Sequence, residues 1–454
     1  MKRGARIHLI AIGLVGVVTG LAWYFTPRAG QVSASEVEHE ARFLSLGVPK
    51  PLDIDHKKEL KVLLADPAIA KNWGLMGTDG SSDVQAAKAW GVTQGSREIV
   101  VAVIDTGIDI AHSDLRNNLW KNPGETGFDK NGKDKATNGL DDDGNGMPDD
   151  VHGWNFVANN GELTDRHGHG THIAGIVGAE GGNGVGISGV SPQVSIMVLK
   201  YYDPYAKAND NLKNTILAIR YAIAKKAHII NYSGGGIEYS QEERDAVIAA
   251  KEAGILFVAA AGNEKSNSDV AKYYPADYPE DNIISVTAIN PDAQVLSTSN
   301  YGEKTVHIAA PGEGIFSTLP GNKYGIMTGT SQATAFVSGV AALIMAHNRE
   351  FAFRQVREQI LKTSDQKLGL QDKTKFSGKL NSYRALVELP ENVTLTGIPT
   401  NNPRRHQVFS GDPNVARPSG EGALQTATYI LNQVLTRQPA APEKEAQPTT
   451  DSQN

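Results

Sequence analysis

Three histidines lie close together in the segment RHGHGTHIAG, which runs from Arg166 to Gly175. A neutral imidazole is a common zinc ligand, and it is also the most frequent general base in enzymes. The spacing of His167, His169 and His172 therefore fits two kinds of site. In a zinc site all three would bind the metal, whereas in a nucleophilic site one of them would take a proton from a hydroxyl. Residues elsewhere in the chain must decide between these readings.

Three further side chains with suitable chemistry stand at the ends of apolar runs. Asp105 follows VVAVI, Asn263 follows LFVAAAG, and Ser331 opens a long apolar segment with helical spacing. With a histidine such as His169, they would supply an orienting carboxylate, a nucleophilic hydroxyl and an amide donor for an oxyanion. Ser331 also fits the simpler role of a helix cap, because serine is favoured at helix N-termini.

The elements that must position these groups are short Val-, Ile- and Ala-rich runs that alternate with helical patterns. They extend from REIVVAVIDTG at residues 97–107 to ATAFVSGVAALIMAHN at residues 333–348. Strands without polar alternation are typical of a parallel sheet that helices cover on both faces. We therefore expect an α/β fold with a mainly parallel central sheet. Ligands in such folds lie beyond the carboxyl ends of the strands, where Asp105 and Asn263 are expected.

Four segments resemble the signature blocks of the subtilisin-like serine proteases, the subtilases. They are VIDTGID, GHGTHIAG, AAGN and GTSQATAFVSG, in that order, and the similarity covers about residues 66–386. The resemblance implies a three-layer α/β/α subtilisin-like fold and a serine endopeptidase that acts on polypeptides through an acyl-enzyme intermediate. It implies that Asp105 orients the imidazole of His169, the general base, that Ser331 attacks the peptide carbonyl, and that Asn263 stabilises the oxyanion.

The same resemblance decides between the histidines. The family's base is the histidine that Gly-Thr-His follows, which is His169, and His172 then packs in the first turn of a helix. We expect His167 to line the cleft beside the base. A zinc hydrolase stays the alternative, although Thr171 stands where the H-x-H-x-D-H pattern of metallo-β-lactamase-like hydrolases requires aspartate.

The segment NYSGGG at residues 231–236 resembles the family's substrate-binding strand, in which glycine lets the backbone approach an extended peptide. A flexible loop is the alternative. The resemblance also places Tyr273 on a wall of the primary specificity pocket and predicts a cis peptide bond between Tyr274 and Pro275. By the same resemblance, Ser233, Gly234 and Gly235 would form one wall of this pocket.

The block around the serine departs from the family's usual SMATPHVAG. Gln332, Ala335 and Phe336 replace methionine, proline and histidine. These changes alter packing but remove no catalytic group, so we expect an active enzyme. The alternative function is a catalytically silent protein of the same fold that binds calcium or a peptide.

The insertion NGLDDDGNGMPDDVHGWNF at residues 138–156 resembles a calcium loop, because its D-x-D-x-N-G-x-x-D pattern arranges oxygen ligands around a glycine turn. No glutamate stands at the twelfth position, so the loop is not a complete EF-hand, and a solvated acidic turn is the alternative. We expect a structural calcium ion here, bound by Asp141, Asp143, Asn145 and Asp149. The family resemblance suggests a second calcium site formed by Asp114, Asn183 and the carbonyls of Val185 and Ile187.

The composition and the N-terminal segment indicate which partners and which cellular location to expect. The 454 residues carry a net charge of −6 and include no cysteine, which argues against a nucleic-acid partner and excludes disulfides. Residues 1–25 hold a basic cluster and then an apolar run long enough to cross a bilayer. We expect a signal-anchor there, or alternatively a cleaved signal peptide, so that the protein is membrane-anchored and faces the extracytoplasmic side, or is exported to the periplasm or the extracellular space.

We expect four regions in all. The segment 1–25 precedes a short stalk or pro-segment at 26–65, and the catalytic domain covers 66–390. The remaining residues, 391–454, are rich in proline, glutamine and threonine, a composition typical of disordered tails. Within this tail the spacing of apolar residues predicts a short helix over 423–435.

Overall fold

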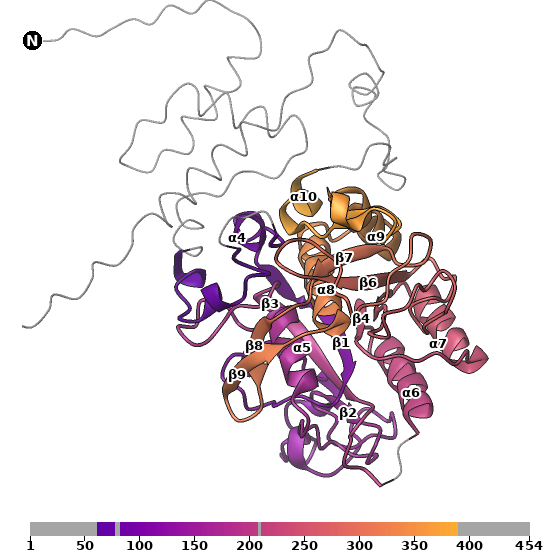
Figure 1. Ribbon diagram of the computed structural model, residues 1–454. Coiled ribbons are helices and arrows are strands. Elements are labelled where there is room, and N and C mark those ends of the chain that lie inside the picture. The colour runs from indigo at the N-terminus through magenta and orange to yellow at the C-terminus, as the bar shows by residue number, and fades with distance from the viewer. Residues whose placement is uncertain (1–60, 78–81, 208–209, 389–454) are drawn as a thin grey trace, which may run out of the picture. The chain divides into compact units, whose positions relative to one another are not determined.

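The computed structural model describes residues 61–77, 82–207 and 210–388 (Figure 1). The strands of this part are β1 (Gly95–Asp105), β2 (Gly153–Asn155), β3 (Gln193–Lys200), β4 (Ile229–Tyr232), β5 (Leu256–Ala260), β6 (Ile283–Ile289), β7 (Ile308–Pro311), β8 (Ile315–Leu319), β9 (Lys323–Met327), β10 (Asp365–Gln366) and β11 (Gly378–Lys379). The α-helices are α4 (Ala86–Ala89), α5 (His169–Gly178), α6 (Asn211–Ala224), α7 (Gln241–Glu252), α8 (Thr330–His347), α9 (Phe353–Lys362) and α10 (Ser382–Val387). The short 3₁₀ helices are η1 (Ile69–Lys71), η2 (Arg116–Asn118), η3 (Pro123–Glu125), η4 (Lys135–Thr137) and η5 (Leu368–Leu370).

Nine strands of the described residues form one sheet in the order β10-β11-β7-β6-β5-β4-β1-β3-β2. Neighbouring strands pair in parallel, apart from the antiparallel pair of β10 and β11 at one edge. A separate antiparallel hairpin joins β8 and β9. The prediction of a mainly parallel sheet is confirmed.

Helices cover both faces of the sheet, and alternate residues of β1 enter two different cores. Val101 and Val103 belong to the core that includes α5 and α8. Ala102 and Ile104 point the other way, into the core that includes α6 and α7. Because successive side chains of a strand face opposite sides, a strand buried on both faces must be apolar throughout, as VVAVI is. The three-layer α/β/α architecture is therefore confirmed.

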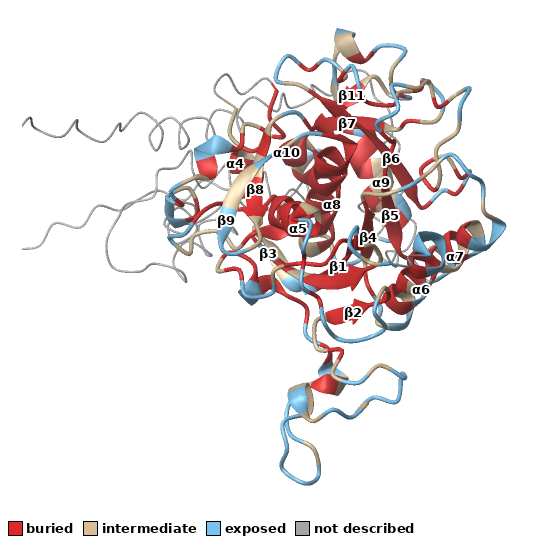
Figure 2. Cartoon of the chain, turned by 60° about the horizontal axis from the view of Figure 1, so that its bottom comes forward, coloured by how far each residue is buried: buried red, intermediate tan, exposed pale blue. Residues whose placement is uncertain are grey.

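Helix α8 is the central helix of its layer (Figure 2). It contacts β1, β4, β5, β6 and β7 and is buried from Thr330 to Met345, whereas α6 and α7 expose their outer faces. A helix that is apolar on all sides is stable only inside a protein. Its N-terminus thereby comes to lie at the edge of the sheet where the central strands end.

Three of the expected regions lie outside the described residues. These are the apolar run near the N-terminus, the stalk as far as residue 60, and the tail with its helix at 423–435. In the part of the chain that the structure does describe, no helix combines the length and apolarity needed to cross a membrane.

Candidate active site

The proton-accepting pair consists of His169 and Asp105. His169 is the first residue of α5, and Asp105 is the last residue of β1. Nδ1 of His169 lies 2.8 Å from Oδ1 of Asp105, whose side chain is 4% exposed, whereas the imidazole is 23% exposed. Since Nδ1–H donates to the carboxylate, the ring is held in the tautomer that leaves Nε2 free to accept a proton. Nε2 has no hydrogen-bond partner among the described residues.

The pKa of His169 reflects two opposing effects. Burial by itself lowers the pKa, because a charged imidazolium is poorly solvated there. The negative charge of Asp105 and its hydrogen bond act in the other direction and outweigh burial, so the pKa lies above its ordinary value of 6.5. The ring therefore gains a proton readily, as a general base must.

A second buried carboxylate, Asp165, holds the turn that leads into α5. It accepts four hydrogen bonds from residues 167–171, two of them from the N–H and the hydroxyl of Thr171 at 2.9 and 2.7 Å. The hydroxyl of Thr106 donates to Asp165 at 2.9 Å and accepts a backbone N–H of α5 at 2.9 Å. The end of β1 and the start of α5 are thus tied together around His169. Sequence analysis did not identify Asp165. Its position four residues before His169, just ahead of the helix, could have indicated a side chain that binds the first turn of α5.

Ser331 is the second residue of α8, and its hydroxyl points back to the chain after β4. The N-cap of α8 is Gly329, and the Ser331 hydroxyl does not cap this helix end. Oγ of Ser331 donates to the carbonyl of Ser233 at 3.0 Å. The alternative role of Ser331 as a helix cap is therefore wrong. Its bond to His169 is not formed here, and catalytic hydrogen bonds commonly tighten only when a substrate binds.

Asn263 lies beside the same helix end. Its Oδ1 accepts from the backbone N–H of Thr330 at 3.0 Å and from the Thr330 hydroxyl at 3.2 Å. The amide nitrogen is left without a partner among the described residues, and the residue is exposed. A Cβ at Gly329 would lie only 3.6 Å from this nitrogen. A donor amide and the N-terminus of α8 thus stand together, which favours a developing oxyanion.

The glycine-rich segment after β4 is fixed by backbone pairing. Gly236 and Tyr274 exchange hydrogen bonds, with Gly236 N–H donating at 2.9 Å and Tyr274 N–H donating at 2.7 Å. Gly235 adopts φ of 152°, and Tyr273 lies directly against it. This segment is therefore held in place rather than being a free loop. The peptide bond between Tyr274 and Pro275 is cis, as predicted.

The other two histidines have different surroundings. His172 is buried, its Nε2 contacts the carbonyls of Ile315 at 3.0 Å and Gly325 at 3.3 Å, and burial lowers its pKa to about 4. His167 is exposed, and the centre of its ring lies 6.1 Å from that of His169. Among the described residues, the side chains that converge closely enough to hold a metal belong to another cluster. The arrangement does not support the zinc alternative.

The unusual residues of the serine block serve packing. Gln332, Ala335 and Phe336 are buried in α8. The ring of Phe336 lies against Gly74, where a Cβ would approach it to 2.4 Å. Phe336 therefore joins the helix to the start of the domain, whereas Oε1 of Gln332 lies beside Gly329 at the start of α8.

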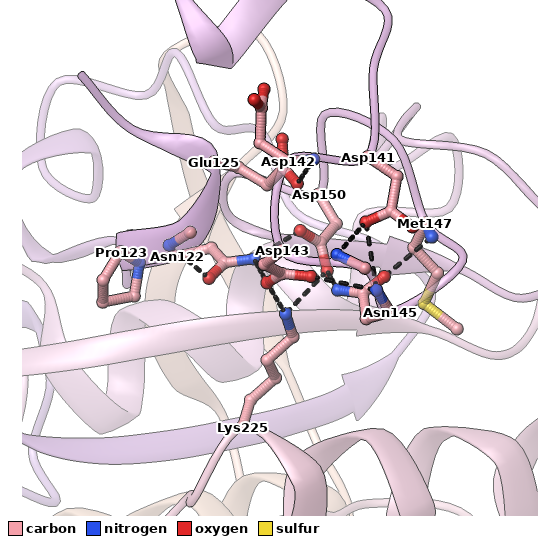
Figure 3. Close-up of polar contacts among 12 residues, drawn as sticks. Asn122, Pro123, Glu125, Asp141, Asp142, Asp143, Asn145, Met147, Asp150 and Lys225 are labelled. Carbon is pink, nitrogen blue, oxygen red and sulfur yellow. Dashed lines mark hydrogen bonds and ion pairs between the residues drawn. The ribbon is translucent and has the colours of Figure 1, made fainter. Parts of the chain in front are cut away.

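The acidic loop gathers a different set of carboxylates from the one predicted (Figure 3). Oxygens of Glu125, Asp143 and Asp150 lie within 4.8 Å of one another. Asp141 instead accepts backbone N–H groups of residues 144–146, and Asp149 accepts the N–H of Gly139. Asn145 donates to Asp150 at 2.8 Å. Of the four predicted ligands, only Asp143 contributes a carboxylate to this cluster.

The cluster is only partly neutralised. The ammonium of Lys225 pairs with Asp143 and lies 3.4 Å from Asp150, and the hydroxyl of Tyr221 donates to Asp150 at 2.6 Å. Oε2 of Glu125 is buried without a partner among the described residues. Burial, together with the charges of Asp150 and Asp143, raises the pKa of Glu125. Three carboxylates thus face one ammonium, and the group could hold a metal ion.

The second predicted calcium site is built around Asp114, which is fully buried. Its carboxylate accepts from the Asn183 amide, the Ile187 N–H and the Tyr324 hydroxyl, each at 2.9 Å. The N–H of Val185 donates to Asn183 at 2.8 Å. The structure brings the four predicted residues into one loop arrangement, in which protein donors already meet both oxygens of Asp114.

Comparison with known proteins agrees with this fold. Residues 96–385 match the profile of the subtilase family. The thermophilic serine proteinase of Bacillus sp. (strain AK1) is 34% identical over 68% of this chain and 66% of its own length. The major intracellular serine protease of Bacillus subtilis (strain 168) is 36% identical over 62% of this chain and 78% of its own. Subtilisin-like protease 2 of Plasmodium falciparum is 33% identical over 62% of this chain but only 19% of its own. The chain belongs to the subtilase family.

Proposed function

We propose that this protein is a serine endopeptidase that hydrolyses peptide bonds in polypeptides through Asp105, His169 and Ser331. The observation that carries the proposal is the 2.8 Å pair of Asp105 and His169, formed where β1 ends and α5 begins. The names of two relatives, a serine proteinase and a serine protease, give it further support.

The chemistry follows from the free atoms of the site. Oγ of Ser331 attacks the peptide carbonyl while Nε2 of His169 takes its proton, and Asp105 stabilises the imidazolium that forms. The oxyanion of the tetrahedral intermediate accepts hydrogen bonds from the Asn263 amide and the start of α8. His169 then returns the proton to the leaving amine, which departs and leaves an ester on Ser331. Water, deprotonated by the same imidazole, hydrolyses the ester and restores the hydroxyl.

A fluorophosphonate probe tests the proposal, because it labels only an activated serine. We expect the full chain to be labelled and Ser331→Ala to lose both label and peptidase activity while it keeps its melting temperature. Ser96→Ala is the matched control, since Ser96 lies at the other end of β1, and it should be labelled like the parent. A folded parent protein that takes up no label would instead favour the catalytically silent binding protein.

We also propose a structural calcium ion at the acidic loop. Its support is the set of hard oxygen donors from Glu125, Asp143 and Asp150, and the buried, unpartnered Oε2 of Glu125. An ion there would offset the charge that Lys225 leaves uncompensated. The second site, at Asp114, Asn183, Val185 and Ile187, stays a prediction from family resemblance.

The setting of the enzyme is a further part of the proposal. The basic cluster and apolar run of residues 1–25 support export or anchoring of the catalytic domain on the extracytoplasmic side. The word intracellular in one relative's name applies to that relative.

A further inference from the structure

The place of the substrate side chain next to the cleaved bond follows from the groups around Ser331. The hydroxyl of Ser331 is joined to the carbonyl of Ser233, so the chain after β4 runs beside the nucleophile. Strand β5 is the neighbour of β4 in the sheet, and Asn263 follows β5 three residues after its last residue, Ala260. A substrate whose carbonyl is attacked by Ser331 and whose oxygen lies at Asn263 would therefore contact both of these stretches of backbone.

Tyr273 occupies the space between these two stretches. A Cβ at Gly235 would lie 2.5 Å from Cε1 of the tyrosine ring, and a Cβ at Gly262 would lie 3.0 Å from its Cδ2. The ring is therefore in van der Waals contact with both glycines. Both have positive φ, 152° and 100°, and both lack the side chain that would collide with the ring.

The backbone on both sides of this ring is anchored. The N–H of Tyr273 donates to Asp277 at 2.8 Å, and the next residue, Tyr274, exchanges two backbone hydrogen bonds with Gly236. The ring of Tyr274 stacks on Tyr278 with 4.8 Å between the ring centres. These contacts fix the backbone that carries the Tyr273 ring beside Gly235 and Gly262.

We propose that Tyr273 forms the floor of the primary specificity pocket and restricts the enzyme to substrates with a small residue, such as alanine, glycine or serine, before the cleaved bond. This inference rests on the proposed peptidase function. A pocket already filled by an aromatic ring has no volume for a large side chain, and rejecting one that does not fit can lower kcat/KM roughly a hundredfold.

The test uses peptides that differ only in the residue before the cleaved bond: alanine, leucine, phenylalanine or lysine. We expect the parent enzyme to prefer alanine by roughly a hundredfold over leucine and phenylalanine. Tyr273→Ala and Tyr273→Gly should raise kcat/KM for phenylalanine and leucine and so remove or reverse this order. Tyr273→Phe is the matched control, because it keeps the ring and should keep the preference.

The fluorophosphonate probe, applied to every variant, separates the two proposals. A parent enzyme without label contradicts the peptidase function itself. If the parent is labelled but prefers phenylalanine, leucine or lysine, the pocket floor is wrongly assigned. The same conclusion follows if labelled Tyr273→Ala or Tyr273→Gly keeps the parent's order of preference.

Discussion

At the scale of single residues, the basicity of His169 depends on its pairing with Asp105. Burial opposes the charged imidazole, and the carboxylate more than compensates, so the pKa lies above 6.5. The base must be neutral to take the serine's proton, so activity is present above this pKa and lost as pH falls through it. The free energy of unfolding depends on pH in the opposite direction. A histidine whose pKa is raised in the folded state stabilises the fold at low pH, and this contribution is lost as pH rises through the pKa of the folded state.

We therefore expect kcat/KM to rise with pH along a titration whose midpoint lies above 6.5. Asp105→Asn should lower the midpoint, because it removes the charge that raises the pKa, and should reduce kcat by roughly 10⁴-fold through the wrong tautomer. The measurement is the pH dependence of kcat/KM for both proteins. His167→Ala is the control and should leave the midpoint near that of the parent. A parent midpoint below 6.5 would contradict the assignment of His169.

At the scale of elements, the site depends on how α5 is joined to β1. Asp165 receives hydrogen bonds from both elements, through Thr106 after β1 and Thr171 in α5. Its two oxygens have different partners, and Oδ2 meets only donors of Thr171 among the described residues. In an Asp165→Asn variant, the NH₂ group of the amide would replace one of these two oxygens. That NH₂ group would face N–H or O–H donors, and at least one donor would lose its acceptor.

Asp165→Asn should therefore loosen the start of α5 and displace His169. A buried donor left unpaired costs about 1–3 kcal/mol, so we expect a lower melting temperature. Since the substrate strand is untouched, kcat should fall with little change in KM. Glu162→Gln tests an exposed carboxylate of the same loop and should change neither quantity. Equal behaviour of the two variants would show that Asp165 does not position the base.

At the scale of the whole molecule, the acidic loop determines how stability depends on metal ions. The chain has no cysteine, so no disulfide braces the long connection between β1 and α5. The carboxylates of Glu125, Asp143 and Asp150 repel one another, and Lys225 offsets only part of their charge. A bound cation would remove this repulsion in the native state alone.

A calcium chelator should accordingly lower the melting temperature and speed self-digestion, while initial rates at low temperature stay unchanged. Binding would stabilise the fold by roughly 2.7 kcal/mol when free calcium is a hundred times its dissociation constant. Glu125→Gln should weaken the calcium dependence of the melting temperature, and Glu303→Gln, at an exposed site before β7, should not. An unchanged melting temperature with chelator would rule out a structural ion. Immediate loss of activity in folded protein would place the metal in the mechanism.

Asp105, Asn263 and Ser331 could be predicted from local sequence patterns, whereas the choice of His169 among three histidines came from the family resemblance. Asp105 and Asn263 follow apolar strands, and the carboxyl ends of neighbouring parallel strands meet at one edge of a sheet. His169 and Ser331 open helices whose apolar residues require burial against that sheet. Local burial patterns therefore determined the fold class and the edge at which the site forms.

Tertiary structure alone decided which distant groups become partners. Lys225 lies 82 residues after Asp143, with which it forms an ion pair, and no periodicity relates the two. Glu125 likewise joins the acidic cluster from η3. Asp149, which we predicted as a ligand, instead accepts a hydrogen bond from the N–H of Gly139. The sequence by itself determined the fold class and the chemistry available at the strand ends, because both follow from local burial patterns. The carboxylates that meet in the acidic cluster and the contact of Tyr273 with Gly235 and Gly262 depend on the packing of segments far apart in the chain, which only the folded structure decides.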